Sequence, residues 1–198
     1  MAESNTGIVD RAVEFAVRKH SGSVRKGTQI PYILHTVEAA AIVAGMTEDQ
    51  ELIAAAVLHD TLEDTETTYD ELEEAFGRRV AKLVEGESED KQQDRPAEET
   101  WKERKQATLD HLKDADLETR ILMLGDKLSN IRAVQRDLKA CTEKGEPFWQ
   151  RFHQQDSAMH GWYYGSIAGI LLSDPALKNT QACREYAERV KAVFGTDC

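Results

Sequence analysis

The stretch Leu52-Ile-Ala-Ala-Ala-Val-Leu-His-Asp-Thr-Leu-Glu-Asp64 decides the fold of this chain. It begins with seven apolar residues in a row, and its Ala and Leu residues favour a helix that is buried on most of its surface. Four ionisable residues stand at the end of that helix: His59, Asp60, Glu63 and Asp64. Such groups are costly beside a hydrophobic core unless a partner satisfies them. The stretch therefore predicts a buried helix that leads into a functional site.

The spacing of these four residues indicates what the partner is. His59 and Glu63 are four apart, as are Asp60 and Asp64, so on a continuous helix each pair lies along one face. His59 and Asp60 can reach one cation from neighbouring sides of the helix. The two carboxylates one turn later would then face whatever the cation binds. We interpret the stretch as a metal site with an acid–base pair beside it.

Length and charge limit the classes of function. With 198 residues, the chain is long enough for a substantial core, and we predict one domain spanning residues 1–198. Lys and Arg number 25 against 36 Asp and Glu, which gives a formal charge of −11. An acidic surface repels nucleic acids and anionic membranes, so neither is an expected partner. The charge is compatible with a protein that binds cations or small phosphorylated ligands.

The cysteines and the N-terminal residues bear on location. Cys141, Cys183 and Cys198 are widely spaced and form no C-x-x-C motif, which is typical of reduced thiols. Residues 1–10 lack the basic and apolar regions of a signal peptide. No apolar run approaches the roughly 20 residues that span a bilayer. We predict a cytoplasmic protein with no membrane segment.

Helical periodicity recurs along the chain, and no β-type alternation accompanies it. We predict an all-α fold, a single compact bundle of roughly eight to ten helices. Residues 52–64 form one of these helices, and the C-terminal part contributes two, at 148–172 and 175–194. The polar stretch 86–99 is either disordered or a functional lid, as loops of this length usually are.

Three helices that look buried each carry residues of a metal-ligand type. These residues are His35, the pair His59 and Asp60, and Asp126. For His35 taken alone, a structural residue with satisfied hydrogen bonds is the simpler interpretation. Taken together they favour a metal, because buried acids need a partner and the sequence offers no matching set of buried bases. Two imidazoles and two carboxylates suit manganese, iron or zinc better than calcium or magnesium.

The same residues carry a resemblance to a known family. The order of His35, His59-Asp60 and Asp126 resembles the H…HD…D pattern of the HD phosphohydrolase superfamily. Within it, three motifs resemble the hydrolase domain of the RelA/SpoT-type alarmone enzymes: Arg25-Lys-Gly…Pro-Tyr-Ile-Leu-His35, Ala55-Ala-Val-Leu-His-Asp-Thr-Leu-Glu-Asp-Thr65 and Gly125-Asp-Lys-Leu-Ser-Asn-Ile-Arg132. With no synthetase or regulatory domain, the chain is similar to a stand-alone small alarmone hydrolase. The resemblance spans residues 8–138.

This resemblance implies an HD-domain helical bundle and a reaction. The family hydrolyses the 3′-diphosphate of guanosine tetra- or pentaphosphate (ppGpp or pppGpp), usually with Mn²⁺, to GDP or GTP and pyrophosphate. It implies that Glu63 and Asp64 orient or deprotonate the attacking water. It further implies the metal ligands His35, His59, Asp60 and Asp126, and the nucleotide contacts Arg25, Lys26 and Asn130. From the residues alone, we add Lys91, Arg104 and Lys105 as candidates for phosphate contacts.

Departures from the family pattern leave alternatives open. Thr36 stands where proline commonly follows the first histidine, and Ala133 where a small hydroxyl residue is frequent. Other HD-type substrates are a ppApp-type alarmone, the 2′-phosphate of NADPH, or a nucleotide cleaved by a nucleotidase. An alternative from a different functional class is a non-catalytic nucleotide-binding or antitoxin-like protein. The ion could also be Fe²⁺ or Zn²⁺, and the oligomeric state stays open.

Overall fold

The computed structural model describes residues 7–88 and 95–195, and all regular elements in those residues are helices. Ten α-helices and one short 3₁₀ helix are present there, with a single isolated β-bridge between Val24 and Pro31. The prediction of an all-α fold is confirmed. No described helix is both long and apolar enough to cross a membrane. The chain divides into two compact units, Met1–Ser88 and Glu89–Cys198, which are treated separately below.

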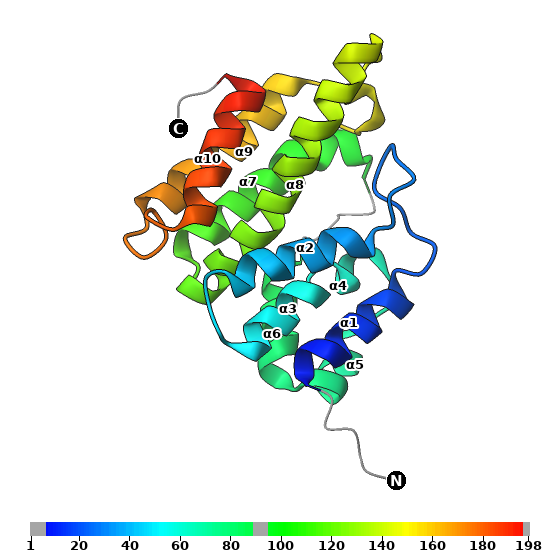
Figure 1. The fold of residues 1–198 in the computed structure, drawn as a ribbon, viewed down its shortest axis with the longest axis vertical. Helices are drawn as coiled ribbons and strands as arrows, with labels where there is room; N and C mark the ends of the chain where they lie inside the picture. The colour runs from blue at the N-terminus through cyan, green and yellow to red at the C-terminus, as the bar shows by residue number, and fades with distance from the viewer. Residues whose placement is uncertain (1–6, 89–94, 196–198) are drawn as a thin grey trace. The chain divides into compact units, whose positions relative to one another are not determined.

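The first unit is built around the helix that the opening stretch predicts. Its helices are α1 (Ile8–Lys19), α2 (Ile33–Ala44), α3 (Gln50–Leu58), α4 (Thr61–Asp64), α5 (Tyr69–Phe76) and α6 (Arg78–Glu87). Helix α3 packs against α1, α2 and α6 (Figure 1). All seven residues from Leu52 to Leu58 are buried, with Ile53 the most exposed at 8%. Each large side chain buried there stabilises the fold by about 1.5–3 kcal/mol.

The start of α3 is fixed by a capping aspartate. Asp49 is the N-cap, and its side chain accepts hydrogen bonds from the backbone N–H groups of Glu51 and Leu52. Arg79 on α6 contacts the same carboxylate at 2.6 Å, which lowers the Asp49 pKa to about 2. The aspartate therefore stays ionised and ties the beginning of α3 to α6.

The continuous helix predicted over residues 52–64 is wrong. Helix α3 ends at Leu58, and α4 begins only at Thr61. Two side chains at this break bond to backbone carbonyl groups at the end of α3. His59 Nδ1 lies 2.8 Å from the Ala56 carbonyl oxygen, and the Thr61 hydroxyl donates to the Leu58 carbonyl at 2.7 Å. Such local side-chain bonds compete with regular helical ones. His59 and Asp60, the two residues at the break, keep backbone angles in the right-handed helical region, with φ of −51° and −90°.

The second unit consists of α7 (Ala97–Asp114), α8 (Leu117–Lys144), the 3₁₀ helix η1 (Trp149–Arg151), α9 (Ser157–Ser173) and α10 (Gln181–Phe194). Helix α10 packs along both α8 and α9, and α7 packs against α9 (Figure 1). Leu122, Ile167 and Tyr186 are fully buried in this core. Tyr186 satisfies its hydroxyl by donating to the Tyr164 carbonyl at 3.1 Å.

The two predicted C-terminal helices begin at the wrong places. The helix expected at 148–172 is interrupted, because Asp156 caps a separate helix by accepting from the Ala158 N–H at 2.8 Å. The helix expected at 175–194 begins at Gln181, where the Thr180 hydroxyl accepts from the Cys183 N–H. In both cases a capping side chain overrides the apolar periodicity. Both ends of the polar stretch 86–99 are helical, since α6 extends to Glu87 and α7 begins at Ala97, and its middle lies outside the described residues.

Candidate functional site

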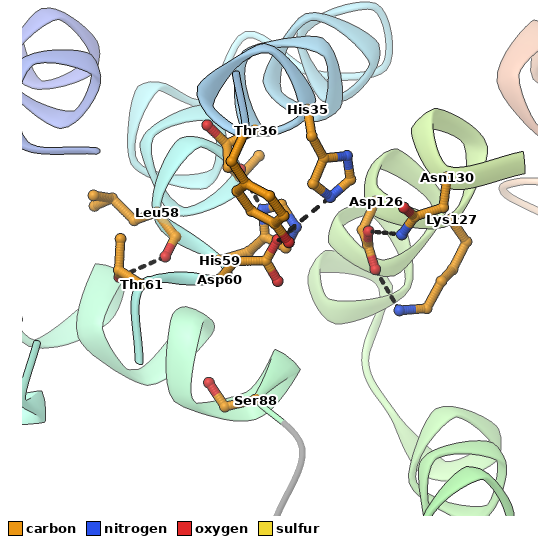
Figure 2. A network of polar contacts seen from close by, with 12 residues as sticks. His35, Thr36, Leu58, His59, Asp60, Thr61, Ser88, Asp126, Lys127 and Asn130 are labelled. Atoms are coloured by element: carbon orange, nitrogen blue, oxygen red, sulfur yellow. Dashed lines mark hydrogen bonds and ion pairs between the residues drawn. The ribbon is translucent and has the colours of Figure 1, made fainter. Parts of the chain in front are cut away.

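In the first unit, two helices and the break after α3 bring two histidines to one carboxylate. His35 Nε2 lies 3.3 Å from Asp60 Oδ2, and His59 Nε2 lies 3.0 Å from the same oxygen (Figure 2). The His35 and His59 rings are edge to face, with centroids 5.1 Å apart. Both histidines are 2% exposed. Three of the four predicted metal ligands therefore converge within this unit.

The protonation of His59 fits a metal ligand. Its Nδ1 contacts the Ala56 carbonyl oxygen, which can only accept a hydrogen bond, so Nδ1 carries the proton of the neutral ring. Nε2 then presents its lone pair toward Asp60 Oδ2, which is itself an acceptor. Two acceptors at this distance repel unless a proton or a cation lies between them. A backbone carbonyl that fixes the tautomer is the usual outer contact of a metal-binding histidine.

Asp60 is held in its ionised form. Burial by itself would raise its pKa, but the neighbouring imidazoles of His59 and His35 outweigh this effect. The net result is a pKa well below the ordinary value of 3.8. An ionised carboxylate between two imidazoles is a suitable set of donors for a divalent cation.

Tyr32 supports this carboxylate and was not among the residues selected from the sequence. Its hydroxyl donates to Asp60 Oδ2 at 2.7 Å, and its ring meets the edge of the His35 ring at a centroid distance of 5.6 Å. Tyr32 precedes His35 by three residues, which is one helical turn. That spacing is the signal from which its position could have been predicted.

We expect Tyr32→Phe to weaken metal binding by about 10–100-fold, the usual effect of removing a group that orients a ligand. The phenyl ring keeps the contact with His35, so helix content should not change. Metal affinity is measured by competition with a chelator, using Tyr69→Phe on α5 as the control. An unchanged affinity would mean that the hydroxyl has no part in holding Asp60.

Glu63 and Asp64, the predicted catalytic pair, lie on the single turn of α4. Glu63 is half-buried and Asp64 is exposed. One helical link is preserved, since the Asp64 N–H donates to the Asp60 carbonyl at 2.9 Å. Asp64 therefore keeps the four-residue relation to Asp60 that the sequence predicts.

Arg25 and Lys26 lie in a loop with internal order. Its two sides are joined by the Val24–Pro31 bridge and by a hydrogen bond from the Arg25 N–H to the Ile30 carbonyl at 2.8 Å. The chain turns at Gly27, whose φ of 73° is in the left-handed region that favours glycine. Arg25 is half-buried and Lys26 is exposed. The loop presents two adjacent cations on a constrained hairpin-like turn.

Thr36, where the family pattern has proline, is accommodated within the first turn of α2. Its hydroxyl donates to the Ile33 carbonyl at 3.1 Å, and the residue is fully buried next to His35. This departure therefore leaves the helix that carries His35 intact.

In the second unit, Asp126 is a buried carboxylate on α8 with two neighbours on the same helix. The Asn130 side-chain amide donates to its Oδ1 at 2.5 Å, and Lys127 pairs with its Oδ2 (Figure 2). Asp126 is 4% exposed, whereas the Lys127 side chain is 16% exposed. Asp126 therefore has a basic partner, although Lys127 itself is only half-buried. The long lysine stem lets a residue next in sequence reach the carboxylate.

The other predicted phosphate contacts are engaged within the second unit or lie outside the described residues. Arg104 donates to the Thr100 hydroxyl at 3.2 Å on its own helix. Lys105 places Nζ over the Tyr163 ring, 5.1 Å from its centroid. Lys91 lies outside the described residues.

Comparisons with known proteins show which sequences and structures this chain is similar to. A model of the HD domain matches residues 12–151. The guanosine-3′,5′-bis(diphosphate) 3′-pyrophosphohydrolase MESH1 of Danio rerio is 37% identical over 145 residues, which cover 72% of this chain and 75% of that protein. MESH1 of Homo sapiens is 38% identical over 149 residues, covering 73% and 75%. A solved structure described as a metazoan ortholog of SpoT that hydrolyzes ppGpp has the same fold, with a TM-score of 0.69, 22% identity, and coverage of 96% of this chain and 97% of that chain.

Proposed function

Because the chain belongs to the HD-domain family, and within it to the family of MESH1 guanosine-3′,5′-bis(diphosphate) 3′-pyrophosphohydrolases, we propose that it hydrolyses the 3′-diphosphate of ppGpp or pppGpp. The products are GDP or GTP and pyrophosphate. The observation that carries this proposal is the cluster of His35, His59 and Asp60, in which three donors suited to a divalent cation converge in a chain with these relatives.

We propose that His35, His59, Asp60 and Asp126 hold one divalent metal ion. The fixed tautomer of His59 and the ionised state of Asp60 support the first unit's share of this set. The burial of Asp126 on α8 supports the fourth ligand. Such an ion polarises a phosphoryl oxygen and makes water more acidic.

The roles of the remaining residues follow from their chemistry. Glu63 and Asp64 would orient the attacking water and accept its proton, since a carboxylate within hydrogen-bond reach can act as a general base. Asn130 would keep Asp126 oriented and border the nucleotide. Arg25 and Lys26 would contact the nucleotide, with Arg104, Lys105 and Lys91 as further candidates for its phosphates.

We propose Mn²⁺ as the native ion, and Fe²⁺ and Zn²⁺ as the other ions that these nitrogen and oxygen donors suit. We also propose that the two units act together as one HD-type domain. The match of the HD-domain model to residues 12–151, which include parts of both units, supports this view. A cytoplasmic location is proposed from the free thiols of Cys141 and Cys183.

A turnover screen tests the reaction. The purified protein with Mn²⁺ is incubated with ppGpp, pppGpp, ppApp, NADPH and simple nucleoside monophosphates, and released pyrophosphate and phosphate are measured separately. We expect pyrophosphate from ppGpp and pppGpp. Phosphate from NADPH or a monophosphate alone would identify a different substrate, and no turnover with any compound would favour the non-catalytic alternative.

We expect Arg25→Ala to raise KM for ppGpp by about tenfold or more while lowering kcat much less. A guanidinium can stack on a base or grip a phosphate in both the ground state and the transition state, so its loss weakens binding uniformly. Steady-state kinetics of the variant and the parent decide this, with Arg78→Ala, an exposed arginine of α6, as the control. An unchanged KM would place the nucleotide elsewhere.

A further inference from the structure

His20 is a buried histidine that none of the motifs above explains. It is 3% exposed and follows the last residue of α1, where its N–H donates to the Ala16 carbonyl at 2.9 Å. Within residues 7–88 and 95–195, neither of its ring nitrogens has a hydrogen-bond partner. A neutral imidazole carries one donor and one acceptor, so burying both without partners destabilises the fold. A phenylalanine in the same space would avoid that cost.

The position of His20 connects two parts of the site. Its ring lies against the Tyr32 ring, with centroids 5.0 Å apart and planes 33° from parallel. Tyr32 in turn donates to Asp60. His20 and Tyr32 also flank the loop that carries Arg25 and Lys26, and both bond to Ser23 through the backbone, at 3.0 and 2.9 Å. His20 therefore lies at the neck of this loop, one side chain away from the Asp60 carboxylate.

The electrostatic surroundings keep the imidazole neutral. Burial lowers its pKa below 6.5, and this effect exceeds the opposing charges of Asp60 and Asp64. A neutral imidazole beside these carboxylates offers an N–H donor without adding a positive charge. The acceptor that would satisfy this N–H is not supplied by the described residues.

We infer that His20 is a ligand-binding residue of this site, whose ring N–H donates to an anionic oxygen of the substrate's diphosphate group when the neck of the loop shifts. The identity of the substrate rests on the proposed function, but pyrophosphate, its product, carries the same oxygens. A charged oxygen is a stronger acceptor than water, and the two loop cations would draw it to this neck. The cost of burying the imidazole is then offset only when the ligand is bound.

The test replaces His20 with Phe, which keeps the ring and its contact with Tyr32 but removes both nitrogens. We expect the metal-free variant to have a Tm higher by about 2–4 °C, because a buried polar group without partners is removed. Calorimetric titration of the Zn²⁺-loaded protein with pyrophosphate should show affinity about tenfold weaker or more. His20→Asn, which restores an N–H donor, should recover part of that affinity. His153→Phe, an exposed histidine of the second unit, should change neither quantity.

Each outcome decides the inference. Parental affinity for pyrophosphate in His20→Phe, no pyrophosphate binding by the parent, or a lower Tm would each overturn it. If His20→Phe does not fold, ¹⁵N spectra of the Zn²⁺-loaded parent are recorded in its place. An imidazole signal of His20 that does not change when pyrophosphate is added would overturn the inference. Turnover of ppGpp by the parent is measured separately. If the parent does not turn over ppGpp but binds pyrophosphate in a way that depends on His20, the proposed reaction is wrong and the inference about His20 still holds.

Discussion

Asp126→Ala is expected to lose both the metal ion and turnover while the chain stays helical. A ligand removed outright should weaken metal binding by more than about 100-fold, the upper end of what loss of an outer group costs. Alanine has the highest helix propensity, so α8 should persist. The hydrogen bond with Asn130 and the pair with Lys127 are lost, but both partners lie on the same helix and are partly exposed.

The measurements are elemental analysis, circular dichroism and pyrophosphate release. Asp126→Asn is the matched variant, because the amide keeps the shape and the contact with Asn130 but removes the charge. We expect it to bind metal weakly as well. Asp110→Ala, an exposed carboxylate of α7, should behave as the parent. An Asp126→Ala protein that keeps a full equivalent of metal would show that the fourth ligand lies elsewhere.

The core of the first unit could be predicted because its signal is local. Seven apolar residues in a row allow few structures other than a buried helix, and all seven are buried in α3. Thr68 followed by Glu71 predicts a helix start, and the Thr68 hydroxyl caps α5 by accepting from the Glu71 N–H. In both cases the residues that decide the element lie within a few positions of it.

The predicted helix boundaries are wrong where side chains make hydrogen bonds that apolar periodicity does not reveal. The histidine and threonine at the end of α3 bond to its carbonyls and interrupt the helix, although apolar spacing continues through Leu62. In the C-terminal part, the start of α9 is set by a capping aspartate. Before it, Trp149 stacks on His160 at a centroid distance of 4.8 Å. A packing contact between residues eleven positions apart has no signature in a helical pattern.

The candidate site was predicted by residue type rather than by geometry. His35, His59 and Asp60 could be selected because ionisable residues in apolar helices need a reason to be there. The only signal for Tyr32 is its three-residue spacing to His35, and His20 has no such signal, since a histidine at the end of a helix is an ordinary residue in a sequence. Their significance depends on the hydroxyl contact with Asp60 and on the buried ring nitrogens, and both depend on how the loop 21–31 folds back.

Glu63→Gln and Asp64→Asn are each expected to lower kcat by on the order of 10²-fold or more, with metal content unchanged. The amide keeps the size of the side chain but can no longer accept a proton. Neither carboxylate belongs to the cluster of His35, His59 and Asp60, so the ion should remain. Loss of turnover together with loss of metal would instead make the substituted residue a ligand.

The break between α3 and α4 allows the two carboxylates to be told apart. Asp64 keeps its backbone link to Asp60 and is exposed, whereas Glu63 is half-buried. A general base must lose its proton for turnover, so replacing it should remove the acidic limb from the pH profile of kcat/KM. A residue that only orients the water should lower kcat and leave that limb in place. Glu66→Gln, an exposed acid just beyond α4, is the control, and parental turnover in both variants would exclude the pair from the mechanism.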